Sequence, residues 1–304
     1  MADGNTLGAI DRVGDAASQD APAISVIIPH YDDLLNLGVC LAALRSQTMA
    51  PDRFEVIVAD NNSRCDRSQL EAVCRDVHLI NAPIQGAAEA RNAGVRAAKA
   101  PRLAFLDSDC RPDPAWLAAG LAALDHHALV GGRVDVSVAN REAVTPAEAF
   151  EQVFAFNNER YIREEKFSVT ANLFTTRAVF EDVGGFRTGV AEDYDWGRRA
   201  AAKGYVWHYA ADAVVEHPAR RDWQELTRKW KRLTSEGFAL AAEAKGGRRR
   251  WIIRSWLMLL SLPLAALQAA RSPRVAQPQD RWKALAVLIR LRWWRFIEAH
   301  RVAF

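Results

Sequence analysis

Short apolar runs alternate with helical stretches through the first third of the chain, and this alternation limits the folds open to it. The expected strands are 24–29, 54–60, 77–80 and 103–106, and the helical stretches between them are 34–46, 69–74 and 87–98. Further along, we expect a strand at 129–138 and a helix at 146–163. This rhythm predicts an α/β fold with a mostly parallel sheet and helices on both faces. Right-handed crossovers place the strand ends, with Pro29, Asp60 and Asp107, along one edge. Open α/β sheets bind their ligands at that edge.

An acidic tripeptide, Asp107-Ser108-Asp109, follows the apolar run Leu103–Leu106. In an extended chain the two carboxylates point to the same side, and hard oxygen ligands suit Mg²⁺ or Mn²⁺. A solvated turn is an equally good interpretation of the tripeptide alone, because Asp and Ser are common turn residues. Aspartate-nucleophile phosphatases also place two acids after a strand. That class is disfavoured because Cys110 and Arg111 follow here, in place of a Gly-Thr type of turn.

Three further positions carry candidate chemistry, and each also has an ordinary explanation. Arg91, near the start of a helix, suits a phosphate or nucleotide, or it is an exposed arginine on an amphipathic helix. The acidic pair Glu192 and Asp193 opens a helix, where acids favour the helix dipole, and one of them could serve as a general base. His217 could complete a metal site with Asp109, although a single histidine is more often structural.

The last third of the chain is basic and rich in tryptophan. Residues 219–304 hold 19 Lys and Arg against 6 Asp and Glu, and seven of the ten tryptophans. Their longest apolar stretch, 256–267, is short of the roughly 20 residues that cross a bilayer. Arginines flank it, and 281–302 is an amphipathic helical pattern. This composition favours contact of 248–304 with an anionic membrane surface; helices packed on the body or in an oligomer are the alternative. Nucleic-acid binding lacks a supporting motif.

The N-terminal residues and the spacing of the cysteines indicate the cellular compartment that we expect. Residues 1–21 lack the apolar core of a signal peptide and are predicted to be a disordered leader. The cysteines are irregularly spaced and include no CxxC pair, which fits a reducing cytosol. We therefore expect a leader at 1–21, an α/β body at 22–218 and a helical tail at 219–304.

Seven strings resemble, in order and spacing, the inverting nucleotide-sugar glycosyltransferases of the GT-A fold, the large bacterial family of the family-two type. They are SVIIPHYDD, FEVIVADNNS, GAAEARNAG, LAFLDSDCRPDPAWL, NLFTTRAVFEDVGGF, AEDYDWGRRAAAKGY and EHP. The resemblance covers residues 24 to about 218 and implies a Rossmann-like GT-A catalytic domain there.

The resemblance also implies roles for single residues. Metal ligands are Asp109 and His217, and the general base is Asp193, with Glu192 as second choice. The residues implied at the nucleotide are Pro29, Tyr31, Asp32, Asp60, Arg91 and Asp107.

The implied reaction is a metal-dependent, inverting transfer of a hexose from a nucleotide sugar, most simply a UDP-sugar, to an acceptor hydroxyl. Mn²⁺ or Mg²⁺ is the implied cofactor. Processive members carry Gln-x-x-Arg-Trp, whereas the comparable region here reads LTRKWKR at 226–232, so we expect non-processive transfer. With the basic tail, the acceptor is expected to be lipid-linked or membrane-proximal, and the protein peripheral on the cytosolic face of the inner membrane. The alternative is a non-catalytic nucleotide-sugar-binding or scaffold protein that keeps the fold.

Overall fold

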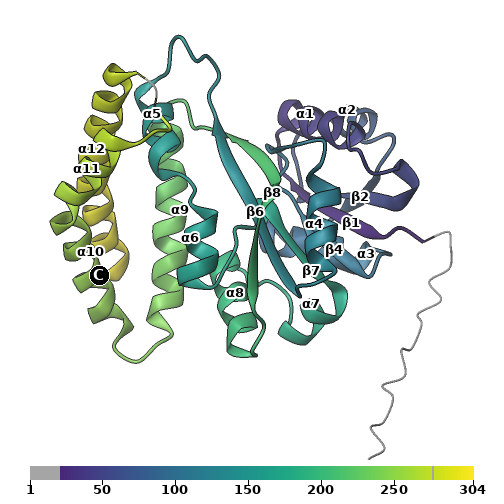
Figure 1. Ribbon diagram of the computed structural model, residues 1–304. Coiled ribbons are helices and arrows are strands. Elements are labelled where there is room, and N and C mark those ends of the chain that lie inside the picture. Colours follow the sequence, from purple (N-terminus) through teal and green to yellow (C-terminus); the bar gives the residue numbers. More distant parts are fainter. Residues whose placement is uncertain (1–20, 276) are drawn as a thin grey trace, which may run out of the picture.

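A computed structural model describes residues 21–275 and 277–304, so the predicted leader lies outside the described residues except for Ala21. The described chain forms one eight-stranded sheet with helices around it (Figure 1). The strands are β1 (Ile24–His30), β2 (Phe54–Asp60), β3 (His78–Asn81), β4 (Arg102–Phe105), β5 (Arg111–Pro112), β6 (Leu129–Ser137), β7 (Leu173–Thr176) and β8 (Trp207–Pro218).

The order of the strands explains why the candidate residues converge. The sheet runs β3-β2-β1-β4-β7-β6-β8-β5. The first four strands are mutually parallel, as the sequence predicts. Strand β7 then runs antiparallel to both β4 and β6, and β8 is parallel to β6. Two reversals restore the original direction, so β8 ends at the same edge of the sheet as β1, β2 and β4.

Helices cover both faces of the sheet. They are α1 (Leu34–Arg45), α2 (Arg67–Val73), α3 (Ala87–Ala97), α4 (Trp116–Leu124), α5 (Pro146–Phe154), α6 (Asn158–Arg160), α7 (Arg177–Val183), α8 (Glu192–Ala202), α9 (Trp223–Ala242), α10 (Gly247–Leu260), α11 (Leu262–Arg271) and α12 (Pro278–Ala303). Short 3-10 turns cover Pro51–Arg53 and Thr170–Asn172, and a π-helical turn covers Tyr161–Glu165.

Two apolar layers hold these helices to the sheet. One layer joins the strands to α1, α2 and α4, and includes Leu41 and Trp116. The other joins them to α3, α7 and α8, and includes Trp196. Helix α3 lies so close to β1 that a Cβ on Gly94 would stand 2.4 Å from Ile27 Cγ2. Glycine is therefore required there, and the close approach fixes the height of α3 over the strand.

The helix expected at about 146–163 is broken after Phe154. The Asn157 side chain accepts a hydrogen bond from the Arg160 backbone N–H at 3.3 Å and opens a new short helix. Asn158 Nδ2 donates to the carbonyl of Gly132 at 2.7 Å. Asparagine side chains offer the backbone alternatives to helical hydrogen bonds, and these two residues redirect the chain toward β6.

The basic tail is helical, and one of its faces is packed against the body. Leu226 of α9 and Leu288 and Leu291 of α12 contact Phe150 of α5 and its neighbours in one buried cluster. Figure 1 shows α9 to α12 gathered beside α5 at one end of the sheet. Within the described residues, no single helix is long and apolar enough to cross a membrane. Helices α10 and α11 are together long and apolar enough, but the chain bends by 49° between them.

A buried asparagine fixes the irregular pairing of β6 with β8. The register shifts after Gly132, where β8 carries extra residues. Asn172 Nδ2 donates to the carbonyls of Arg133 and Ala213, both at 2.9 Å, and its Oδ1 accepts from Trp116 Nε1 at 2.9 Å. The fully buried amide therefore satisfies both strands at the bulge and directs the end of β8 toward the edge of the sheet.

We predict that Asn172→Ala destabilises the protein by about 2–4 kcal/mol, because it leaves two carbonyls and an indole N–H buried without partners. Urea unfolding followed by circular dichroism measures the change. Gln69→Ala, on the exposed side of α2, is the control and should change stability by less than about 0.5 kcal/mol. Equal stability of the two variants would contradict the role assigned to Asn172.

Candidate active site

The carboxyl ends of β1 and β2 present two buried polar side chains. Asp60 is 5% exposed, its Oδ1 has no hydrogen-bond partner among the described residues, and its Oδ2 lies 3.9 Å from Arg67. His30 pairs in register with Asp60, and neither of its ring nitrogens has a partner there. Burial lowers the pKa of His30, so the imidazole is neutral at neutral pH. Asp60 can therefore accept a hydrogen bond from a bound molecule, and a ring N–H of His30 can donate one. The sequence analysis named Asp60 and overlooked His30.

Tyr31 and Asp32 follow β1 and connect two loops. Asp32 has a positive φ of 51°, and its Oδ1 accepts from the backbone N–H groups of Arg64 and Cys65 at 2.5 and 3.1 Å. Tyr31 is 43% exposed and lies under the Arg64 guanidinium. Pro29 lies within β1, opposite Ala59. Of these three residues, Tyr31 has the most surface free for a ligand, whereas Asp32 braces the loop after β2.

Arg91 is buried and bridges two acids. Its Nη2 lies 2.5 Å from Asp107 Oδ1, and its Nη1 is paired with Glu192. Only 4% of the arginine side chain is exposed. Arg91 therefore faces the protein's own carboxylates and bridges the end of β4 and the start of α8, and its place near a nucleotide stays a prediction.

The acidic tripeptide forms a turn, which differs from the extended chain that we expected. The Cys110 backbone N–H donates to the carbonyl of Asp107 at 3.1 Å and closes the turn. The two carboxylates consequently have different partners: Asp107 pairs with Arg91, whereas Asp109 Oδ2 lies 3.5 Å from His217 Nε2. Burial opposes ionisation of Asp107, but the charge and hydrogen bond of Arg91 outweigh burial and hold the Asp107 pKa below its usual value.

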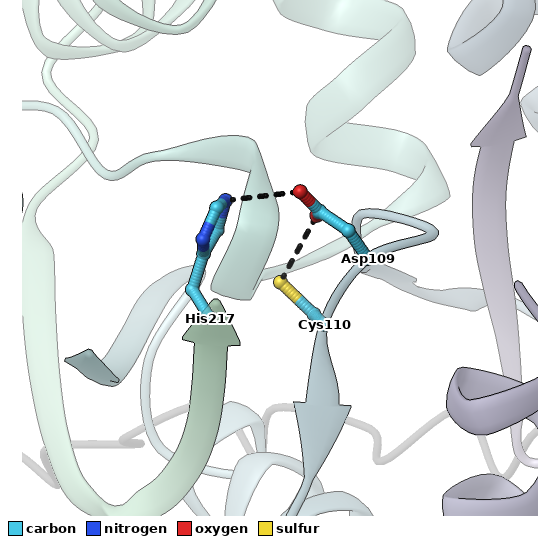
Figure 2. Close-up of side chains that lie close together, drawn as sticks. All are labelled: Asp109, Cys110 and His217. Atoms are coloured by element: carbon cyan, nitrogen blue, oxygen red, sulfur yellow. Dashed lines mark hydrogen bonds and ion pairs between the residues drawn. The ribbon is translucent and has the colours of Figure 1, made fainter. Parts of the chain in front are cut away.

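His217, at the end of β8, faces Asp109 (Figure 2). Burial lowers the pKa of His217 in spite of the nearby Asp109 carboxylate, so the ring is neutral. A neutral imidazole nitrogen facing a partly exposed carboxylate fits a divalent cation. The Cys110 thiol lies in the same group, with its ligand atom within 4.8 Å of those of Asp109 and His217.

The two acids at the start of α8 differ in charge environment. Glu192 is paired with Arg91, whereas Asp193 is half-buried and, within the part of the chain that the structure describes, its Oδ1 accepts only from the backbone N–H of Tyr194, at 2.8 Å. Burial, together with the neighbouring Glu192 charge, raises the pKa of Asp193 to about 6. A carboxylate with that pKa is suited to accept a proton near neutral pH.

A second buried ion-pair group, which the sequence interpretation missed, supports His217. Glu151 of α5 accepts from Lys229 Nζ at 2.6 Å and from the Arg220 backbone N–H at 2.8 Å. Burial opposes the Glu151 charge, but Lys229 and Arg220 outweigh it and lower its pKa. The ring of Phe156 lies between Lys229 and His217. A glutamate in the apolar face of the predicted helix was the only sequence signal for this group.

Comparison with known proteins identifies the family of this chain. The sequence profile described as "Glycosyl transferase family 2" matches residues 25–184. Glycosyltransferase AglE of Haloferax volcanii is 31% identical over 251 residues, which cover 80% of this chain and 82% of that protein. Pre-mycofactocin glycosyltransferase of Mycobacterium tuberculosis is 28% identical, over 66% of this chain and 44% of its own length.

Solved structures show the same fold. Mannosyltransferase PcManGT from Pyrobaculum calidifontis, in complex with GDP-Man and Mn²⁺, superposes with a TM-score of 0.57 at 21% identity, covering 93% of this chain and 86% of that one. S. aureus TarS 1-349 in complex with UDP-GlcNAc gives a TM-score of 0.51 at 17% identity, covering 88% and 71%. The fold is GT-A, and the chain belongs to glycosyl transferase family 2.

Proposed function

We propose that this glycosyltransferase moves a hexose from a nucleotide sugar to an acceptor hydroxyl in one displacement, with inversion. The observation that carries the proposal is the Arg91 bridge, which joins Glu192, the neighbour of the desolvated Asp193, to Asp107, in the turn that also carries Asp109 beside His217. Family membership and the nucleotide-sugar complexes of the two solved structures support it. A UDP-sugar is the first donor to test, and GDP-mannose the second.

Asp109 and His217 would hold a divalent cation, Mn²⁺ or Mg²⁺. When bound, the cation neutralises charge that develops on the departing nucleoside diphosphate. Asp107 is paired with Arg91, and we assign it the role of fixing the turn that carries Asp109. The unpartnered Oδ1 of Asp60 is the acceptor for an N–H of the nucleobase.

Asp193 would act as the general base. It accepts the proton of the acceptor hydroxyl as that oxygen attacks the anomeric carbon, and the bond to the diphosphate breaks on the opposite side. Glu192 is less suited, because its charge is already satisfied by Arg91. The ion pair holds the start of α8, so the base is positioned by its neighbour.

We predict that Asp193→Asn lowers kcat by about 10²- to 10⁴-fold, the usual contribution of a general base. Release of nucleoside diphosphate from a panel of sugar nucleotides, with Mn²⁺ and a lipid extract as acceptor source, measures it. In the unmodified enzyme, kcat/KM should fall as pH decreases through about 6, because Asp193 then becomes protonated.

Asp52→Asn, an exposed carboxylate at the far end of β2, is the matched control and should keep full activity. Full activity in Asp193→Asn would exclude it as the base. Turnover of no donor in the panel by the unmodified protein would favour the alternative, a non-catalytic nucleotide-sugar-binding or scaffold protein.

We predict that Arg91→Lys lowers kcat by about 100-fold, because one ammonium group cannot bridge Asp107 and Glu192 and a small displacement of the site is costly. The same nucleoside diphosphate assay measures the loss, and thermal unfolding shows whether the variant is folded. Arg96→Lys, on the exposed face of the same helix, should be unchanged. Equal kcat in the two variants would show that the bridge does not position the site.

We further propose that the tail seats the enzyme on the cytosolic face of the inner membrane. The outer face of α10 and α11, here called the α10–α11 apolar surface, consists of Ile253, Trp256, Leu257, Leu260, Leu264 and Leu267, each at least 46% exposed. Exposed arginines flank it on both sides, including Arg254 and Arg271. An apolar surface bordered by cations suits an anionic lipid interface. The acceptor would then be lipid-linked or membrane-proximal, and the absence of Gln-x-x-Arg-Trp favours non-processive transfer.

We predict that replacing Trp256, Leu260 and Leu264 together by Ser weakens binding to phosphatidylglycerol vesicles at least about tenfold, because each buried apolar side chain contributes about 1.5–3 kcal/mol. Vesicle co-sedimentation measures the binding. Leu35→Ser with Val206→Ser removes exposed apolar groups elsewhere and should bind normally. Unchanged binding of the triple variant would refute this membrane surface, and a persistent dimer lost only in that variant would indicate an oligomer contact.

A further inference from the structure

The Cys110 thiol lies beside the two residues assigned to the catalytic cation. Cys110 Sγ is 3.9 Å from Asp109 Oδ1, and Asp109 Oδ2 is 3.5 Å from His217 Nε2 (Figure 2). All three ligand atoms lie within 4.8 Å of one another. Cys110 and His217 are 1% and 3% exposed, whereas Asp109 keeps part of its surface open. A bound ion would therefore have protein ligands on one side and an open side for substrate.

The separations are close to those around a small tetrahedral ion. Bonds of about 2.3 Å to sulfur and about 2.0 Å to nitrogen or oxygen place the ligand atoms about 3.3–3.6 Å apart. The observed distances are 3.5 Å from His217 Nε2 to Asp109 Oδ2 and 3.9 Å from Cys110 Sγ to Asp109 Oδ1, and all three ligand atoms lie within 4.8 Å, so the side chains must draw together around a bound ion. Cys110 belongs to the turn that Asp107 and Arg91 fix, so its sulfur is held at this position from the backbone.

The hydrogen bonds of His217 determine which of its two ring nitrogens can bind a metal. Its Nδ1 lies 2.9 Å from the carbonyl of Pro218, which can only accept, so Nδ1 carries the proton. Nε2 therefore keeps its lone pair and lies 3.5 Å from Asp109 Oδ2 and 3.4 Å from Arg220 Nη1, so a bound ion would displace the guanidinium from that nitrogen. Histidine ligands commonly donate their second N–H to a carbonyl in this way, which fixes the tautomer and the ring direction.

We propose that Cys110 is a third protein ligand, so that Asp109, Cys110 and His217 form a carboxylate–thiolate–imidazole site that binds Zn²⁺ or Co²⁺ more tightly than Mn²⁺ or Mg²⁺. This inference rests on the proposed function in placing the cation at Asp109 and His217. As the metal–sulfur bond forms, the thiol S–H bond breaks and its proton passes to solvent; nothing is oxidised or reduced. Thiolate and imidazole are soft or borderline ligands, whereas Mg²⁺ and Mn²⁺ prefer all-oxygen sites.

The competing explanation is that the thiol only fills the core and donates a weak hydrogen bond to Asp109. Cys110 does lie in the apolar layer that includes Trp116. The two explanations differ in one observable, which is a bond between sulfur and the metal. Cobalt reports that bond directly, because thiolate coordination produces a sulfur-to-metal charge-transfer absorption in the near ultraviolet.

The test is a Co²⁺ titration of the full-length, metal-free protein followed by absorption spectroscopy. We expect the charge-transfer band at one equivalent in the unmodified protein and in Cys65→Ser, a thiol of the loop after β2. The band should be absent in Cys110→Ser, with circular dichroism as a check of folding. Cys110→Ala is the second variant if the serine protein does not fold. Absence of the band at saturating Co²⁺, or an equal band without Cys110, would overturn the proposal.

A competition measurement tests the metal preference. Zn²⁺ outcompetes Mn²⁺ at most nitrogen and oxygen sites, so the measured quantity is the Zn²⁺ concentration that releases half of the Mn²⁺ from the unmodified protein and from Cys110→Ser, observed as free Mn²⁺ by electron paramagnetic resonance. Cys110→Ser should bind Zn²⁺ at least about tenfold more weakly, since even outer-shell partners of a metal contribute tenfold or more. Equal Zn²⁺ affinity would contradict the assigned ligand. Both readouts are independent of turnover: a protein that shows the cobalt band but uses no donor would retain this site and refute the proposed transfer.

Discussion

The arrangement of the acids in this site depends on one buried guanidinium. Arg91 joins Asp107, which follows β4, to Glu192, which opens α8. Without a cation between them, these carboxylates and Asp193 would repel one another in a desolvated space. The arginine satisfies two of the three and leaves Asp193 with a raised pKa. One ion-pair group therefore joins two distant segments. It also makes the two neighbouring acids different: Glu192 is held in an ion pair, whereas Asp193 can accept a proton.

The residues around His217 are also held by one buried charge, which here is an anion. Glu151 is a buried anion that holds Lys229 of α9 and the backbone of Arg220, three residues after His217. Because α9 belongs to the basic tail, the tail contributes to the packing that positions His217. The boundary expected near residue 218 thus marks a change of composition, whereas the packing continues across it.

Local patterns were sufficient for the parallel half of the sheet, because buried parallel strands are short apolar runs and their ends share an edge. They were not sufficient where distant residues decide the structure. The partners of Arg91 lie 16 and 101 residues away, so no local pattern identifies the two carboxylates that it bridges. The turn at Asp107–Cys110 and the helix break at Asn157 both depend on polar groups that compete with regular backbone pairing. Strand β5 and helices α4 and α7 were also not predicted.

The tail shows why composition alone leaves its role open. Two of its arginines are stacked on tryptophans of α9: Arg290 lies 3.9 Å from the ring centre of Trp223, and Arg295 lies 3.8 Å from that of Trp230. Such cation–π contacts bind α12 to α9, so these basic and aromatic side chains already serve the packing of the tail. The remaining exposed tryptophans, leucines and arginines are the ones that bear on a lipid surface. Helix α9 also holds Lys229 against Glu151. The tail helices therefore connect the α10–α11 apolar surface to His217 through packed side chains.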